Sequence, residues 1–345
     1  MLRESTVHTD WCEKTMSILR EKQFEACERR LNAHQRVSLF SEEATEADAQ
    51  RLWEGSYYRQ EMPPALLSID DLRSHVLERL PVEAQYLSQG EATLLERLLV
   101  CGGVILLGEW DDIGAAEALV SRLWCSFHAT DDEWSLELPE SLHEPLLLAM
   151  NMPQYAQARD VLFRYDAMVM GLLYIAGFLH SVQPIQLFLQ DVIKDTSPLA
   201  LSIARRYLQA AFEYVKNSRG ELILLHPGLA EPERLITEIV GEEMFTVELS
   251  QEMITGGMNG LLPEEEDLHA AMCAALSGCL RPGYDTAEAA EDLRMLVKQG
   301  VDLKELETVM DSMLCVLPTE AMKFALTQLY QRIPHWSGLR ACLQH

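Results

Sequence analysis

The sequence is poor in basic residues. Its 345 residues include 28 Lys and Arg against 54 Asp and Glu, which gives a formal net charge of −26. Because Lys and Arg bind phosphate backbones by displacing counterions, a chain of this charge repels nucleic acid on average. The segment 159–219 departs from the average, with seven bases and five acids. Composition therefore argues against nucleic acid as a partner everywhere except in this segment.

Long apolar runs and cysteine pairs are also missing. The most apolar run covers residues 167–179, whereas a membrane-spanning helix needs about 20 residues. The first residues show no apolar stretch of the kind that follows the basic start of a secretory signal. The eight cysteines form no CxxC pair, which favours reduced thiols. We therefore expect a cytoplasmic protein without membrane attachment, and the oligomeric state stays open.

Motifs for chemistry are absent as well. The glycine-rich segment 256–260 is not followed by GK[ST] but by Glu264 and further acids, which would repel a phosphate. His269 and Cys273 share a helix face, yet Cys279 lies about 240° around the helix from Cys273, so a zinc site lacks ligands. There is no GxSxG sequence. We predict no cofactor, no metal and no catalytic residue.

Hydrophobic residues make up 48% of the chain, which is enough for a folded core. Apolar residues recur mostly at helical spacing. We expect capped helices beginning at Ser41, Ser68 and Ser88, and a long helix over 154–180. Later helices are expected from Ser197-Pro198 and, in the last third, at about 264–279, 286–299, 302–314 and 318–331.

Short strands interrupt the helices at two places. Cys101-Gly-Gly-Val-Ile-Leu-Leu predicts a helix end and a buried strand, and residues 127–138 predict two strands around Thr130-Asp131-Asp132-Glu133. The order helix, strand, helix and hairpin is that of a winged helix. Helices followed by a β-like run at 220–227 indicate a second such module.

We therefore predict a mainly α, multi-helical protein with two winged-helix-like modules carrying short β-hairpins, and a C-terminal helical bundle. The expected domains are a helical arm (1–62), a helical and winged-helix-like module (63–150), a second winged-helix-like and helical module (151–245) and the bundle (246–345).

This order of segments resembles a group of uncharacterised bacterial proteins that join a small helical module to winged-helix-like and helical segments. The small module is similar to the N-terminal domain of the transcription terminator Rho. The segments that carry the resemblance span about half the chain: LSIDDLRSHVLERL (67–80), LLERLLVCGGVIL (94–106), WSLELPESLHEPL (134–146), GLLYIAGFL (171–179) and ELILLHPGLAEPERLI (221–236). The resemblance implies an architecture and no activity.

The charge of each predicted module indicates which kind of partner it binds. Residues 91–149 hold twelve acids and two bases, so the first module does not suit DNA and we expect it to bind protein. The predicted protein-binding residues are Asp111, Asp112, Asp131, Asp132 and Glu133. In the second module a basic arc would bind DNA or form salt bridges with the acidic remainder; it consists of Arg205, Arg206, Lys216 and Arg219.

The leading hypothesis is a non-enzymatic interaction or regulatory protein whose acidic surface binds a basic protein partner. Its more specific form is an inhibitor or chaperone of a nucleic-acid-binding protein. Two alternatives stay open. One is a DNA-associated transcriptional regulator that uses residues 155–235, and the other is an enzyme whose site is assembled from dispersed residues.

Overall fold

The computed structural model describes residues 38–60, 68–108, 113–129, 133–216, 221–229 and 251–336. Within these ranges the chain forms two compact units. The N-terminal unit comprises residues 38–166 and 181–214, and the C-terminal unit comprises residues 167–180 and 215–336. The predicted arm helix over residues 11–31 and the helix after Glu231 lie outside the described residues.

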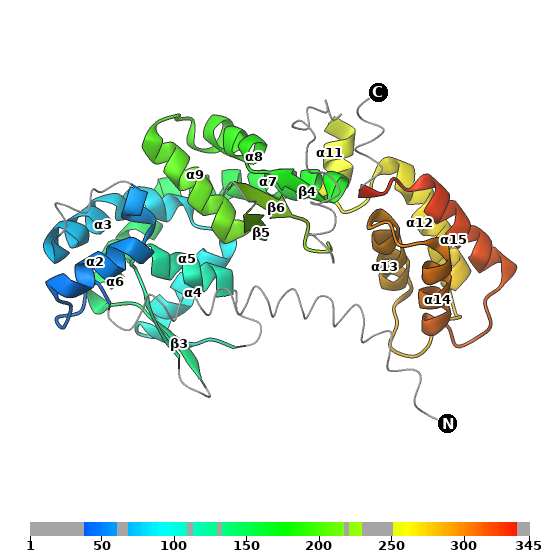
Figure 1. Cartoon of the computed structure of the whole chain (residues 1–345), viewed down its shortest axis with the longest axis horizontal. Helices are drawn as coiled ribbons and strands as arrows, with labels where there is room; N and C mark the ends of the chain where they lie inside the picture. Colours follow the sequence, from blue (N-terminus) through cyan, green and yellow to red (C-terminus); the bar gives the residue numbers. More distant parts are fainter. Residues whose placement is uncertain are drawn as a thin grey trace. The chain divides into compact units, whose positions relative to one another are not determined.

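The described part is mainly helical, with 13 α-helices and two small antiparallel sheets of three strands, as the sequence predicted (Figure 1). The helices of the N-terminal unit are α2 (Glu46–Gly55), α3 (Ile69–Glu83), α4 (Gln89–Val100), α5 (Ile113–Ser121), α6 (Glu140–Met150), the first part of α7 (Pro153–Ala176), α8 (Val182–Leu187) and α9 (Pro198–Ala211). This unit also contains two 3-10 turns, η1 (Tyr57–Gln60) and η3 (Ala84–Tyr86), and one π-helical turn, η4 (Phe188–Ile193).

Side-chain caps fix where several of these helices begin. Ser68 accepts a hydrogen bond from the amide of Asp71, and Ser88 caps α4 in the same way through Glu91, as predicted. The predicted cap at Ser41 is wrong. Thr45 caps α2 instead, because Asp48 completes a capping box with it.

The first sheet follows α4. It consists of β1 (Val104–Leu106), β2 (Ser126–Ala129) and β3 (Trp134–Glu137) in the order β1-β3-β2. Ile105 and Phe127 each pair with Leu136, and these three side chains enter the core of the unit. The predicted strand after Cys101 and the predicted strand pair are confirmed.

The second sheet has the same strand order. Its strands are β4 (Phe178–His180), β5 (Tyr214–Lys216) and β6 (Leu222–Leu225), arranged β4-β6-β5. Only β6 was expected from the sequence. The predicted helix over 154–180 ends early, at Ala176, because Gly177 adopts a φ of 77° and its carbonyl accepts a hydrogen bond from the amide of His226 at 2.8 Å.

A helical bundle makes up most of the C-terminal unit (Figure 1). After α11 (Gln251–Met258) come α12 (Pro263–Leu276), α13 (Thr286–Lys298), α14 (Leu303–Met313) and α15 (Glu320–Arg332), close to the predicted ranges. Leu268, Leu293, Met310 and Leu326 lie in one shared core, as expected for amphipathic helices with short connections. No described helix combines the length and the apolar composition needed to span a bilayer.

Replacement of Gly177 by Ala should destabilise the C-terminal unit by at least about 2 kcal/mol. The reason is twofold: a side chain at positive φ costs about 1–2 kcal/mol, and its Cβ would lie 2.8 Å from the ring of Trp336. Gly278→Ala is the matched control, because Gly278 also has a positive φ of 73° but no neighbour within 4 Å of the added Cβ. Urea unfolding of both variants measures the difference, and equal losses would contradict the contact with Trp336.

Candidate functional site

The most concentrated group of charged side chains in the N-terminal unit is buried. Glu83, at the end of α3, is fully buried. Its Oε1 accepts from Nη1 of Arg206 at 2.7 Å, and its Oε2 accepts from Nη1 of Arg122 at 3.2 Å and from the hydroxyl of Tyr58 at 3.0 Å. Arg122 also donates through Nε to Glu91 at 2.8 Å. We call Tyr58, Glu83, Glu91, Arg122 and Arg206 the Glu83 network.

The Glu83 network is electrically balanced. Burial alone would raise the pKa of Glu83, but the adjacent guanidinium groups of Arg206 and Arg122 outweigh it and hold that pKa below its ordinary value. Glu83 therefore stays charged beside two guanidinium groups, which is tolerable in an interior only because each group has partners. The network joins α3, α4, the end of α5 and α9. Since its charges are all buried, its role is to position these helices.

Helices α5 and α9 pack against each other inside this unit. Both present small side chains at the buried face, including Ala115 and Ala116 of α5 and Ala200 and Ala204 of α9. Small side chains allow close approach of two helices. The face of α9 that carries Arg206 is therefore covered by protein.

A second buried cluster lies in the C-terminal unit. Glu265 of α12 is 2.6 Å from Nζ of Lys298 and accepts from the hydroxyl of Tyr174 at 2.5 Å, while Nη1 of Arg294 is 3.8 Å away. Burial lowers the pKa of Lys298, although Glu265 opposes the shift. Trp336 donates through Nε1 to the carbonyl of Tyr174 at 3.0 Å. The cluster joins α12, α13 and the end of α7 to the segment that follows α15.

His226 borders this cluster and is held neutral. Its ring lies against Trp336 and Tyr174, and burial, with a smaller contribution from Lys298, lowers its pKa to about 4. Its Nδ1 accepts a hydrogen bond from the amide of Gly228 at 3.0 Å. Protonation would replace that acceptor by a donor, so the neutral form belongs to the folded state.

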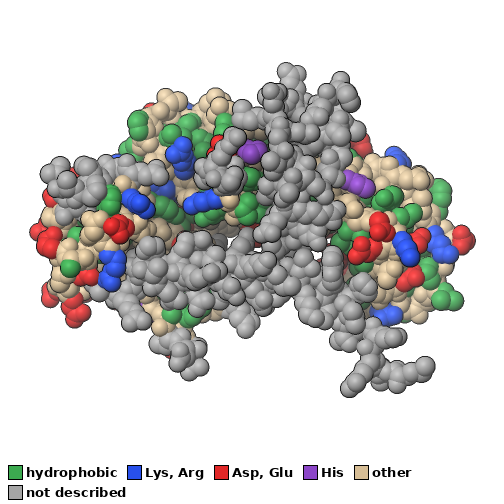
Figure 2. Space-filling model, viewed as in Figure 1, with side chains coloured by type: hydrophobic (Ala, Val, Ile, Leu, Met, Phe, Trp, Pro, Cys, Tyr) green, Lys and Arg blue, Asp and Glu red, His purple; other side chains and the backbone are tan. Residues whose placement is uncertain are grey.

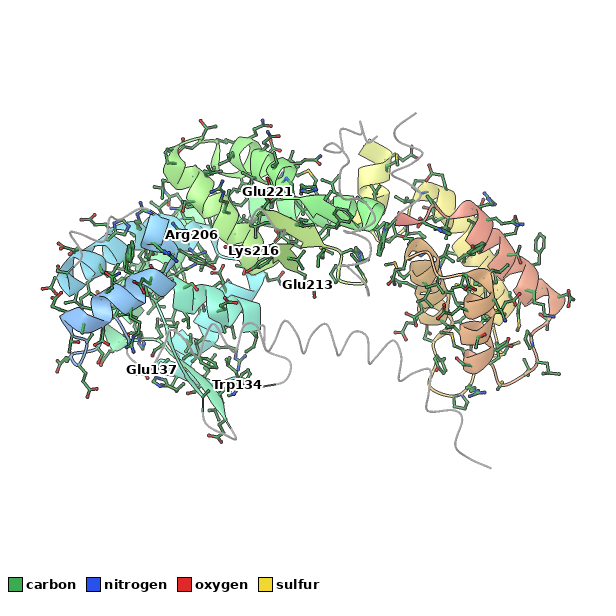
Figure 3. The ribbon with its side chains drawn as sticks, viewed as in Figure 1. Trp134, Glu137, Arg206, Glu213, Lys216 and Glu221 are labelled. Atoms are coloured by element: carbon green, nitrogen blue, oxygen red, sulfur yellow. The ribbon has the colours of Figure 1, made fainter. Side chains whose placement is uncertain are left out.

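Of the five predicted protein-binding residues, the structure describes Glu133. Glu133 is exposed at the start of β3. Trp134 and Glu137 follow it on that strand (Figure 3). Asp111, Asp112, Asp131 and Asp132 lie outside the described residues.

The residues of the predicted basic arc also differ in their surroundings. Arg205 is exposed on α9 and Lys216 is exposed on β5, whereas Arg206 is only 3% exposed (Figure 3). Arg219 lies outside the described residues. Arg206 therefore cannot belong to an exposed basic surface. It forms an ion pair with Glu83 instead, which is the second of the two roles predicted for these bases.

Other sequence candidates serve packing. The glycine-rich segment 256–260 is helical in its first part, because Gly256 and Gly257 belong to α11. A Cβ at Gly257 would lie 2.5 Å from the carbonyl oxygen of Gly171, so this glycine permits close contact with α7. His269 and Cys273 do meet, with Nε2 and Sγ 3.5 Å apart. Among the described residues, no group of three or more His, Cys, Asp or Glu side chains is arranged to hold a metal ion.

The exposed surface of the helical bundle is acidic. Residues 263–336 hold 13 acids and six bases, but Glu265, Arg294 and Lys298 are buried. Twelve exposed acids therefore face solvent together with four exposed bases. Figure 2 shows acidic side chains on the visible face of this bundle. Burial of the two bases makes this surface more negative than the composition of the segment indicates.

Comparison with known proteins adds no relative: no family model, no curated protein and no solved structure matches the chain.

Arg206→Met should destabilise the N-terminal unit by about 3–5 kcal/mol, because it leaves the buried carboxylate of Glu83 with one guanidinium partner fewer. Arg205→Met, next to it on the same helix but exposed, should change stability by less than about 0.5 kcal/mol. Urea unfolding, followed by hydrogen exchange of α9, gives both values. Equal effects of the two substitutions would show that the Glu83 network does not hold α9.

Asp166→Asn should stabilise the protein at pH 7, by on the order of 1 kcal/mol. Burial raises the pKa of Asp166 to about 6, while the hydroxyl of Tyr207, 2.8 Å from both carboxylate oxygens, opposes this. Since the folded pKa exceeds the unfolded one, the stability from this group is complete below pH 4 and is lost as the pH rises through 6. The gain of the Asn variant should therefore shrink between pH 7 and pH 4. A gain that does not depend on pH would contradict the role of this ionisation.

Proposed function

We propose that the protein is a non-enzymatic interaction or regulatory protein whose acidic surface binds a basic protein partner. The observation that carries the proposal is the position of α9. By its place in the chain this helix would be the recognition helix of the winged helix that we propose, yet it packs against α5 and its Arg206 is buried in the Glu83 network.

The order of elements explains why α9 is the relevant helix. The chain order α7, β4, α8, α9, β5 and β6, together with the sheet order β4-β6-β5, agrees with the element order of the winged helix that we propose for this segment. In such proteins the helix before the hairpin enters the major groove. In the first module α5 precedes the β2–β3 hairpin, as α9 precedes β5 and β6. The helices that would contact DNA in the two modules therefore contact each other, which favours protein binding over groove binding.

Surface charge supports the same partner class. The bases of segment 159–219 are partly used inside the protein: Arg206 pairs with Glu83, and Arg159 donates to the carbonyl of Leu87. The bundle exposes twelve acids and four bases. An acidic surface attracts basic proteins over a Debye length of about 8–10 Å and does so less strongly at high salt. In the more specific form of the proposal, the acids occupy the nucleic-acid groove of the partner.

The immobilised full chain should retain basic proteins from an extract at about 50 mM salt and release them at about 500 mM. Charge-neutralising substitutions at Asp111, Asp112, Asp131, Asp132 and Glu133 should weaken retention. A second variant with equal charge change carries Glu264→Gln, Asp267→Asn, Glu288→Gln, Glu305→Gln and Glu320→Gln, and it measures how much the acidic surface of the bundle contributes to retention. Competition by added duplex DNA would support the inhibitor form. If no basic protein is retained at low ionic strength, the proposal fails.

The DNA-binding alternative depends on Arg205 and Lys216, which are both exposed. A mobility-shift assay at low salt tests it with the unchanged protein and with Arg205→Glu and Lys216→Glu. We expect no shift of duplex DNA by any of the three. A shift that the two substitutions abolish would favour the regulator instead.

A further inference from the structure

Strand β1 lies at an edge of its sheet among the described strands, because the order is β1-β3-β2. Ile105 pairs with Leu136, and hydrogen bonds on either side run from the amide of Leu107 to the carbonyl of Trp134 and from the amide of Leu138 to the carbonyl of Gly103. In an antiparallel ladder the backbone groups of alternate residues point to opposite sides. Those of Val104 and Leu106 therefore point away from β3, toward the outer edge.

One backbone atom at the outer edge of β1, the carbonyl oxygen of Leu106, has a hydrogen-bond donor nearby. Nη2 of Arg97 lies 3.5 Å from the carbonyl oxygen of Leu106, within a long hydrogen bond. Within the described part of the chain, the amide groups of Val104 and Leu106 and the carbonyl of Val104 make no hydrogen bond. An unpaired strand edge is a template for another strand.

The side chains of this edge are apolar and exposed. Val104 is 52% exposed and Leu106 is 58% exposed, while Ile105 between them is buried in the core. Val100, at the end of α4 just before the strand, is 86% exposed. Proteins usually protect such an edge with Lys, Pro or a bulge, and β1 has none of these within Val104–Leu106. Two outward apolar side chains on an unpaired edge suit an incoming strand.

The charges around β1 indicate what kind of strand would bind. Glu137 is exposed and pairs directly with Val104, and Glu133 is exposed at the start of the same strand. In the described part of residues 88–149 six acids reach solvent: Glu96, Glu117, Glu133, Glu137, Glu140 and Glu144. Of the two bases there, Arg122 is buried, so Arg97 is the one accessible base in this part. Charge complementarity therefore favours a basic strand.

We propose that β1 binds an extended basic segment of the partner protein as an additional strand of this sheet. The Lys and Arg side chains of that segment alternate onto the face of Val104, Leu106 and Glu137, where their aliphatic stems contact the two apolar side chains and their charges approach Glu137. The backbone of the segment bonds to the outer groups of β1. This inference rests on the proposed function and names the place where the partner binds.

The probe is a fluorescent peptide of nine residues in which Lys and Val alternate, and its counterpart alternates Glu and Val. The full chain should bind the Lys peptide at low ionic strength and bind the Glu peptide at least tenfold more weakly. Strand addition should also slow the amide hydrogen exchange of Val104 and Leu106, because their N–H groups become hydrogen-bonded. A loose electrostatic encounter would not protect these two amides.

Val104→Lys should lower the affinity for the Lys peptide at least tenfold, because it places a like charge on the edge and removes apolar surface. Val104→Thr keeps the branched shape and should retain most of the binding. Leu317→Lys is the matched control: it adds the same charge at a side chain that is 88% exposed in the C-terminal unit. Val104 and Leu317 are both exposed in the native chain, so the three variants should keep its melting temperature.

Unchanged exchange of the Val104 and Leu106 amides in the presence of the Lys peptide would overturn the inference. Equal loss of binding in Val104→Lys and Leu317→Lys would overturn it too. The proposed function would survive either result if the Val104→Lys chain still retained basic proteins in a salt-sensitive way. It would fail separately if the unchanged chain retained none.

Discussion

The N-terminal unit depends on the burial of one carboxylate, that of Glu83. A charge in a protein interior is stable only when its partners are in place, and removal of one partner is costly. Arg122, Arg206 and Tyr58 come from the end of α5, from α9 and from the turn after α2. All three segments must therefore be in place before the buried carboxylate of Glu83 has its hydrogen-bond and ion-pair partners. The network selects one arrangement of helices that apolar packing alone would leave less specific.

That arrangement explains how an element order associated with DNA binding occurs in a strongly acidic chain. With α9 held against α5, the apolar face that these helices share is used for folding. The one basic segment of the sequence supplies Arg206 to the interior. Under the proposed function, the surface that meets the partner consists of strand edges and acidic side chains, which attract a basic protein and repel a phosphate backbone.

The sequence predicted most helices because their signals are local. Ser68 and Ser88 cap their helices through a residue three positions later, and Gly177 marks the end of α7. The short strands β4 and β5 were missed, since three residues give too little pattern, and β4 in addition pairs with β6 far along the chain. The Glu83 network was missed although a signal exists. Glu83 continues the buried stripe of Ile69, Leu72, Val76 and Leu80, where an acid is out of place unless it is paired.

Burial also changes what the net charge of −26 means. Among the described residues the buried charges are three acids and four bases, namely Glu83, Glu91, Glu265, Arg122, Arg206, Arg294 and Lys298. Within the described part the interior thus takes more bases than acids, although acids outnumber bases by 54 to 28 in the sequence. The described surface is consequently more acidic than its composition indicates. Such a surface repels itself, and the basic segment that we propose at the edge of β1 would relieve part of that repulsion beside Glu137.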